Sequence, residues 1–407
     1  MNINKGFRSI ALVSSIVILF FILVSSTVSA SFTETQITKN GTAGWGHDIY
    51  RNTLVWNDES NAYSTSDIHM YDLSTKKETK VTTSEKAWGP SIYGNRIVWM
   101  DSRNGVDKSD IYMYDIPTKK ETRITNSQSA VGPSIYGNRI VYRDYRNGNS
   151  DIYMYDLSTK KEIRITTSKS AYNAKIYGNR IVYQDLRSGS GMSDIYMYDL
   201  STKKETRITK SQSAVVPDIY GNRIVWEDTR NVNIDIYMYD LSTKKETQIT
   251  SNISNSQTPA IYGNTIVWFD DRNGNDSIYA YDLITHQQIH TMSKSNKYAP
   301  AIYGNKVMWS DYSTQYKADI YGGTISYLPV AVFIASPTSG VHPLNVQFTD
   351  KSTDAYYWYW KFGDGITSTV QNPVHKYTRK GAYTVSLTVK NAAGSSSLTK
   401  SKYIKVK

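Results

Sequence analysis

Two positions beside a repeated motif carry the side chains best suited to binding a ligand. The motif is Ile-Tyr-Gly-Asn, which recurs with small changes from residue 49 to residue 305. Four residues before it, several copies carry an aromatic ring, and one residue before it, some carry a charge. Rings and charges around one opening can hold a sugar or a peptide. The candidate ligand-binding residues are Trp45, Trp88, Tyr172, Tyr298, Asp48, Lys175 and Asp218. The alternative is that these loop positions vary because nothing constrains them.

A second pattern places an arginine two residues after an aspartate, as in Asp144 and Arg146. The carboxylate can accept hydrogen bonds from turn amides while the guanidinium pairs with a neighbour. The stretch 144–151 is also rich in the oxygen ligands that calcium accepts, but an arginine inside it opposes a cation. We therefore expect a structural loop and no cofactor, with calcium as the alternative.

No sequence motif for catalysis or metal binding is present. The chain has no cysteine, which excludes disulfides and thiolate sites. His286 and His290 fall on an expected strand, where four residues span about 13 Å, too far for one ion. Nucleophile-elbow, phosphate-loop and zinc-protease motifs do not occur. We therefore predict no catalytic residue, no metal site and a protein that is not an enzyme.

Internal repeats define the elements that must position these residues. The Ile-Tyr-Gly-Asn motif recurs every 41–43 residues, and a second motif, Asp-Ile-Tyr-Met-Tyr-Asp, follows in each unit. Turn residues interrupt every unit at the spacing of short strands, and no helical periodicity is found after residue 30. The pattern predicts a seven-bladed β-propeller over residues 31–328. Both candidate positions enter the innermost strands, and therefore one mouth of the central channel.

The seventh unit ends after its third strand. The missing outer strand is matched by residues 34–38, Glu-Thr-Gln-Ile-Thr, which are identical to residues 246–250. Pairing that segment with the last blade would close the ring and remove a free sheet edge. The pattern Val-Trp-x-Asp-x-Arg followed by Asp-Ile-Tyr-x-Tyr-Asp-Leu and Arg-Ile-Thr resembles the repeats of TolB-like β-propellers. That resemblance implies a ring that binds protein partners in the cell envelope.

A different domain is expected over residues 329–407. It contains Phe-Gly-Asp-Gly at 362–365 and Asn-Pro-Val-His-Lys-Tyr at 372–377, and it is similar to PKD domains. The resemblance implies an immunoglobulin-like β-sandwich, so the whole chain is predicted to be all-β. Residues 383–389 alternate apolar and polar side chains, as a half-buried strand does. A propeller joined to a PKD domain resembles archaeal cell-surface proteins of the surface-layer type.

The first 30 residues are typical of an export signal. Lys5 and Arg8 precede an apolar run, and small residues end it at Ala30. An uncleaved membrane anchor is the alternative. The net charge is +11, but much of it falls in residues 330–407, and the propeller segment is nearly neutral. That distribution argues against a nucleic-acid partner.

Together these features predict an extracellular, cell-surface protein without enzymatic activity. Its expected partner is a protein or a carbohydrate at the cell surface, with the membrane touched only through the N-terminal segment. One alternative is a secreted polysaccharide-active enzyme, a lyase or a hydrolase, with its site in the propeller channel. Another is a TolB-like scaffold of an envelope complex.

Overall fold

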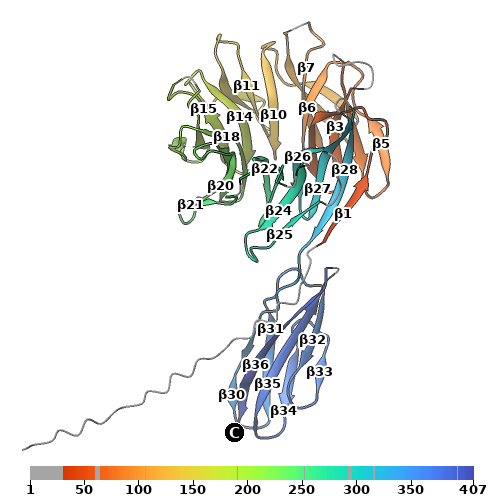
Figure 1. Cartoon of the computed structure of the whole chain (residues 1–407), viewed down its shortest axis with the longest axis vertical. Coiled ribbons are helices and arrows are strands. Elements are labelled where there is room, and N and C mark those ends of the chain that lie inside the picture. The colour runs from red at the N-terminus through yellow and green to blue at the C-terminus, as the bar shows by residue number, and fades with distance from the viewer. Residues whose placement is uncertain are drawn as a thin grey trace, which may run out of the picture.

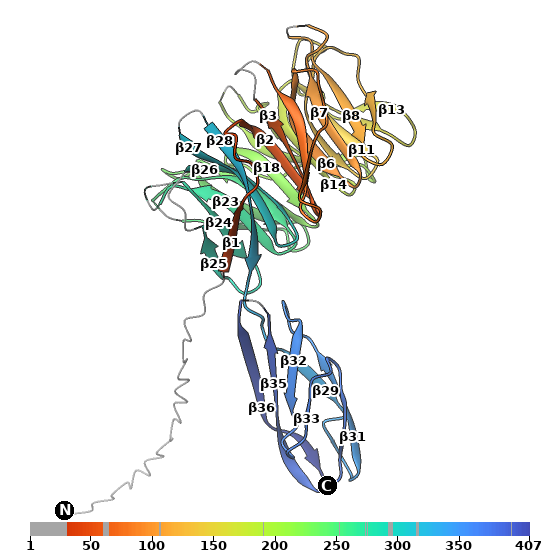
Figure 2. The same cartoon turned by 90° about the vertical axis from the view of Figure 1, so that its right-hand side faces the viewer.

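A computed structural model describes residues 31–407 except 60–64, 106, 190, 252, 273, 275, 292–295, 315–316 and 392. The expected signal segment, residues 1–30, lies outside the described residues. Every regular element in the described part is a β-strand, and no helix there is long and apolar enough to cross a membrane. A ring of sheets is followed by a smaller β-sandwich (Figures 1 and 2). The predicted all-β fold class is confirmed.

Seven four-stranded antiparallel sheets form the ring, and each is one blade of a propeller. The strands of blades 1 to 3 are β2 Ala43–Tyr50, β3 Thr53–Asp58, β4 Asp67–Asp72, β5 Lys77–Lys80, β6 Ala87–Tyr93, β7 Arg96–Asp101, β8 Asp110–Asp115, β9 Lys120–Arg123, β10 Ala130–Tyr136, β11 Arg139–Asp144, β12 Asp151–Asp156 and β13 Lys161–Arg164. Those of blades 4 to 6 are β14 Ala171–Tyr177, β15 Arg180–Asp185, β16 Asp194–Asp199, β17 Lys204–Arg207, β18 Ala214–Tyr220, β19 Arg223–Asp228, β20 Asp235–Asp240, β21 Lys245–Gln248, β22 Ser256–Tyr262, β23 Thr265–Asp270, β24 Ser277–Asp282 and β25 Gln288–His290. Blade 7 consists of β26 Asn296–Tyr303, β27 Lys306–Thr314, β28 Lys317–Ser326 and β1 Ser31–Gln36.

The core lies between blades, because both faces of the middle strands are apolar. In blade 3, Val141 and Met154 pack against blade 4, while Ile140 and Tyr142 pack against blade 2. The innermost strand of each blade runs toward a tight turn, Arg51-Asn52 in blade 1 and Gly-Asn in the others, so all seven turns meet at the same end of the channel. The first residues of these strands, and the loops after the second strands, lie at the opposite end.

The ring is closed by the first described residues. Strand β1 pairs antiparallel with β28, with Ser31 opposite Ser326 and Gln36 opposite Tyr321. Beyond the strand, the Thr38 hydroxyl donates to Asp319 Oδ1 at 2.8 Å. In blade 5 the Thr250 hydroxyl makes the same bond to Asp235 Oδ1. The N-terminal segment therefore occupies the place of an outer strand.

The second domain is a sandwich of two sheets. One contains β29 Phe333–Ser336, β31 Leu344–Asp350 and β34 Val374–Tyr377. The other contains β30 Ser339–Gly340, β36 Ser395–Val406, β35 Gly381–Lys390, β32 Tyr357–Lys361 and β33 Thr367–Ser368. Trp360 is fully buried between them. His375 donates to or accepts from Asp364 at 2.7 Å and stacks on Phe362, so it belongs to this core.

Candidate ligand-binding funnel

One mouth of the propeller channel opens into a hollow of about 570 Å³, here called the funnel. It is lined by the middle residues of the innermost strands from all seven blades. In six of these strands one extra residue bulges out of register before the strand enters the channel, as between Val131 and Ser134. A bulge turns the strand and re-aims the side chains that follow it. The residue after each bulge therefore points toward the funnel.

The bulges force an uncommon backbone conformation. Gly89 and Gly132 have φ near +58°, where glycine is at ease. Val216 and Thr258, at the same place in blades 5 and 6, have φ of 50° and 49°. Branched side chains rarely adopt positive φ, and such strain persists only where the surroundings hold it. The bulge therefore has the same positive φ in blades 5 and 6, although valine and threonine disfavour that conformation.

Three of the predicted residues meet in this funnel. Asp48 comes from blade 1, Lys175 from blade 4 and Asp218 from blade 5, and all three line the hollow. Burial raises the pKa of Asp48 and of Asp218 above the usual value for aspartate. The Lys175 ammonium acts in the opposite direction on both carboxyls, and the charge of Asp48 adds to the rise for Asp218. The three groups therefore share one electrostatic environment.

Hydrogen bonds across blades hold the two carboxyls in place. Asp48 Oδ2 accepts from the Ser91 hydroxyl at 3.0 Å and from the Ile92 amide at 2.9 Å, both in blade 2. Asp218 Oδ2 accepts from the Ile261 amide at 2.9 Å in blade 6. Each aspartate thus bridges to the next blade, which fixes its position without neutralising its charge.

His47 lies beside Asp48 and was missed as a candidate. Its Nδ1 is 3.2 Å from the Ser310 hydroxyl, and its Nε2 is buried without a hydrogen-bond partner among the described residues. Burial lowers its pKa to about 4, so the ring is neutral at physiological pH. Its place one residue before a candidate position was the only sequence signal.

The aromatic candidates do not line the hollow. Tyr172 lies under the Arg143 guanidinium of the preceding blade, 4.7 Å from ring to cation, and Tyr298 packs edge-on against Phe269. Trp88 pairs with Met100 at the start of its strand. Tyr172 and Tyr298 precede the bulge, and both lie against the preceding blade. The Trp45 side chain lies outside the described residues. A binding role for the seven candidates stays a prediction.

Glu227 is a further ionisable group near the funnel rim. Its carboxylate accepts from the amide of Thr258 at 2.6 Å, in the next blade. Burial raises its pKa to about 7. The equivalent position is uncharged or basic in other blades, so nothing in the repeat marked it.

The aspartate–arginine pairs form structural brackets at the funnel end. Arg146 bonds both Asp144, at 2.7 Å, and Glu162, at 2.6 Å. Burial opposes ionisation of Asp144, but hydrogen bonds from Arg146, Ser127 and Ser129 outweigh it and hold its pKa below the usual value. Arg103, Arg187 and Arg230 make the same double pairing in their blades.

The opposite mouth of the channel is surrounded by tyrosines. Neighbouring rings around it are 4.5–4.9 Å apart between centroids, and the series closes on itself. We call this ring the collar; its members are Tyr50, Tyr93, Tyr136, Tyr177, Tyr220, Tyr262 and Tyr303. Each follows the funnel position by two residues, so funnel and collar lie one strand repeat, about 7 Å, apart.

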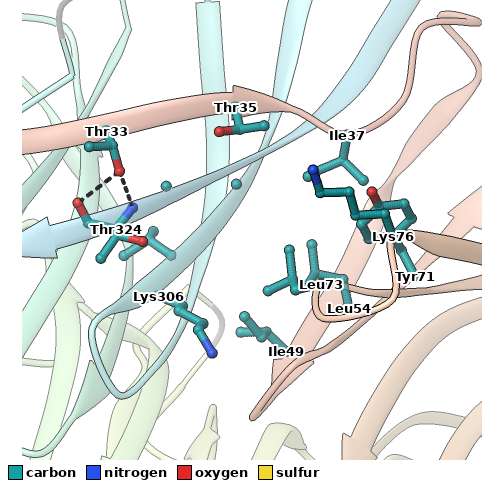
Figure 3. A pocket seen from close by; sticks show the side chains of 13 residues that line it. Thr33, Thr35, Ile37, Ile49, Leu54, Tyr71, Leu73, Lys76, Lys306 and Thr324 are labelled. Carbon is teal, nitrogen blue, oxygen red and sulfur yellow. Dashed lines mark hydrogen bonds between the residues drawn. The ribbon is translucent and has the colours of Figure 1, made fainter.

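A separate cavity of about 360 Å³ lies in the seam between blades 7 and 1 (Figure 3). It is lined by Ile37, Leu54, Leu73 and Gly322 among others. Gly322 pairs with Met308, in the register where Met154 pairs with Val141 in blade 3. Because glycine has no side chain at this position, the contact between blades 7 and 1 is less densely packed than the contact between blades 3 and 4.

The C-terminal segment matches a known family. Residues 328–406 match the PKD domain, as the motifs predicted. The chain is also 42% identical over 71 residues to collagenase ColA of Bacillus cereus, and 44% identical to collagenase ColQ1 of the same species. Each match covers 16% of this chain and 7% of the collagenase.

The propeller is similar in fold to several solved structures. The β-propeller domain of the trilobed protease from Pyrococcus furiosus matches with a TM-score of 0.57 at 12% identity, covering 70% of this chain and 94% of that one. An oligogalacturonate lyase in complex with manganese matches at 0.55 and 12%, covering 74% and 94%. The acylaminoacyl peptidase of Pyrococcus horikoshii matches at 0.56 and 12%, covering 76% of this chain and 57% of the peptidase.

These likenesses establish the fold and overturn one expectation. We predicted a protein that is not an enzyme because no catalytic motif occurs. The same propeller fold is part of a protease, a peptidase and a lyase, so that prediction is wrong. The prediction relied on contiguous sequence motifs. In the funnel, neighbouring side chains come from different blades, whose residues lie far apart in the sequence. A funnel site therefore leaves no contiguous motif.

Proposed function

We propose that this protein is an extracellular polysaccharide-active enzyme whose site is the funnel. The observation that carries the proposal is the meeting of Asp48, Asp218 and Lys175 in one hollow, with both carboxyl pKa values raised by burial. Cleavage of a glycosidic bond commonly uses two carboxyl groups, one as acid and one as base. The occurrence of the fold in an oligogalacturonate lyase supports a polysaccharide as the substrate class.

The three groups have complementary roles in this proposal. A carboxyl with a raised pKa retains its proton to higher pH and can donate it to a leaving oxygen. Lys175 favours ionisation of both carboxyls, and because the charge of Asp48 raises the pKa of Asp218, one carboxyl can be ionised as the base while the other keeps its proton. Neutral His47 contributes a polar nitrogen at the wall.

Export supports the same reading. A PKD domain beside the propeller fits an extracellular protein, and residues 1–30 have the pattern of a cleavable signal. The partner is then a carbohydrate of the cell surface or its surroundings. The aromatic residues Trp88, Tyr172 and Tyr298 lie near the start of the innermost strands, before the bulge, and would contact sugars beyond the cleaved bond.

The test is an activity screen of the purified protein on neutral and acidic polysaccharides. New reducing ends would report hydrolysis, and unsaturated products would report elimination. We expect Asp48→Asn and Asp218→Asn each to lower the rate at least about 100-fold, as loss of an acid or base does. Ser134→Ala is the matched control, because Ser134 occupies the same ring position in blade 3 without a charge.

Two results would overturn the proposal. One is activity that survives both aspartate substitutions. The other is tight binding of a polysaccharide or protein in the funnel with no product from any substrate, which would make the funnel a recognition site. A stable fold for each variant is checked by its melting temperature.

A further inference from the structure

The collar is a continuous aromatic ring at the end opposite the funnel. Neighbouring tyrosine planes are tilted by 44–59° to one another, and every ring is partly exposed. Tyrosine presents a flat apolar face with a hydroxyl at its edge, which suits contact with a sugar ring. The repeat places all seven there because each tyrosine directly precedes the tight turn between the first two strands of its blade, Arg51-Asn52 after Tyr50 and Gly-Asn after the other six.

A belt of basic side chains surrounds the collar and is held by neutral groups. Arg139 donates to Asn179 Oδ1 at 2.6 Å and to the Gly178 carbonyl at 3.2 Å, both in the next blade. The nearest carboxylate oxygen paired with it is 3.8 Å away, on Asp156. Four more groups make the same contact with a neighbouring asparagine: Arg96, Arg180, Arg223 and Lys306. Neutral acceptors fix these cations without cancelling their charge.

The arginines of the funnel end differ in this respect. Arg146 contacts two carboxylates within 2.7 Å, so its positive charge is compensated by groups of the protein itself. Both sets of arginines arise from the same repeat, yet in the collar belt the paired carboxylates of Asp156 and Asp240 are 3.8 Å from the cation, which leaves much of its charge available to a ligand. A positive charge is not required at the belt positions for folding, since the asparagine side-chain oxygen could equally accept a hydrogen bond from an uncharged donor.

Lysine pairs extend the positive charge outward from the collar. The turn between the third and fourth strands carries two exposed lysines in each of blades 1 to 5: Lys76 and Lys77, Lys119 and Lys120, Lys160 and Lys161, Lys203 and Lys204, and Lys244 and Lys245. Blade 6 forms the same turn with Thr285, His286 and Gln287. The lysines are therefore not needed to make the turn.

The PKD domain adjoins the two blades, 6 and 7, that lack a lysine pair in this turn. A cavity of about 580 Å³ is lined by Thr265 and Asn305 of blades 6 and 7 and by Asp354 and Tyr356 of the PKD domain. Thr265 stands where blades 2 to 5 have an arginine. Figure 2 shows the domain below this side of the ring. The lysine pairs thus occupy blades 1 to 5, which contribute no residue to this cavity.

We propose that the collar end is a second binding site, which takes an acidic polysaccharide. A sugar ring would rest on the collar tyrosines, and its carboxylates would pair with the arginine belt and the lysine turns. Arginine forks match carboxylate geometry, and exposed lysines add long-range attraction. This site shares no side chain with the funnel, so it does not depend on the proposed catalytic role.

The experiment measures binding of polygalacturonate to the full protein, with uncharged dextran and duplex DNA as comparison probes. The variant Lys120→Gln/Lys161→Gln/Lys204→Gln removes three charges at the collar end. Its matched control, Lys108→Gln/Lys169→Gln/Lys210→Gln, removes three exposed charges at the funnel end. Glutamine is already tolerated in the latter loops, at Gln128 and Gln212. Tyr136→Ala tests the collar itself.

We expect the collar-end triple variant to bind polygalacturonate about tenfold more weakly and with a smaller salt dependence. The control triple variant should bind as the parent does, and Tyr136→Ala should weaken binding without changing the salt dependence. Equal losses from both triple variants, equal affinity for dextran, or tighter binding of DNA would each overturn the proposal. Asp48→Asn should leave this binding unchanged, so failure here is distinguishable from failure of the funnel proposal.

Discussion

The two ends of the propeller are made from one repeat but treat charge in opposite ways. At the funnel end the arginine that follows a buried aspartate is bound to carboxylates, as Arg146 is to Asp144 and Glu162. At the collar end each cation of the belt is held by an asparagine and a carbonyl, as Arg139 is by Asn179 and Gly178. One residue type therefore stabilises loops at one end and offers charge at the other.

The two ends differ because an arginine at the funnel end pairs with a buried carboxylate, and an arginine of the collar belt does not. Asp144 is fully buried, and a buried carboxylate without a cation costs several kcal/mol. Arg139 compensates no buried charge, so its contribution to stability is that of an exposed polar contact. Burial of the acidic partner, rather than the arginine itself, decides whether the side chain is structural.

The largest expected effect comes from removing one arginine at each end. Arg146→Ala should lower the free energy of unfolding by about 3 kcal/mol, because it leaves Asp144 buried and unpaired. Arg139→Ala should cost less than about 1 kcal/mol. Urea denaturation of the two variants measures both values.

The double variant Asp144→Asn/Arg146→Ala serves as the control for this comparison. It removes the buried charge with its partner and should recover part of the loss. Equal costs for the two single variants would show that the ends do not differ in the way described.

Acid should act on the funnel end through His47. Its folded pKa of about 4 lies below the ordinary value of 6.5, so on acidification the unfolded chain binds a proton first. The stability that it contributes is complete above pH 6.5 and is lost as the pH falls toward 4, by up to about 3 kcal/mol. Asp48 and Asp218 act oppositely, because their raised pKa values favour the protonated folded state.

The measurement is therefore the difference between the parent and His47→Gln across that pH range. The parent should lose stability relative to the variant between pH 7 and pH 4. Tyr136→Phe, at the collar end, should follow the parent over the same range. A parallel course for parent and His47→Gln would contradict the assignment.

The smallest expected effect separates the closure seam from the other blade contacts. A Cβ at Gly322 would meet Ile37 at 3.7 Å, an ordinary contact that faces the seam cavity. Gly322→Ala should raise the unfolding free energy by about 0.5 kcal/mol. A Cβ at Gly323 would lie 2.5 Å from the Thr33 carbonyl oxygen, so Gly323→Ala should destabilise by about 2 kcal/mol. Thermal melting of both variants checks the contrast, and destabilisation by Gly322→Ala would refute it.

The spacing of the repeats was enough to predict the blades. Units of 41–43 residues with four strand-length segments leave few alternatives, and the motifs at 362–365 and 372–377 indicated the PKD domain that residues 328–406 match. The funnel positions Asp48, Lys175 and Asp218 were found because they vary among nearly identical units. Position relative to a turn was sufficient to place them on one mouth.

What the sequence could not indicate depends on ring closure and on bulges. Tyr136 is only a strand residue until seven copies are brought into a circle, so the collar was missed. Tyr172 precedes a bulge whose left-handed residue, Asn173, turns the strand, and the ring goes between blades. The direction of the Tyr172 side chain therefore depends on the φ angle of Asn173, which the repeat pattern does not indicate. The prediction that the chain is not an enzyme relied on contiguous motifs, and a funnel has none, because it takes its residues from blades far apart in the sequence.

The pairing of β1 with β28 joins residues about 290 positions apart. Contacts between residues this far apart form late in folding, because the entropy cost of closing a long loop must be met before the contacts stabilise the chain. The circle is therefore the last part of the propeller to form, and a chain still being made or exported holds an unpaired leading strand. Until residues 317–326 arrive, that strand can pair with another molecule, and slow delivery would favour exchange of strands between copies.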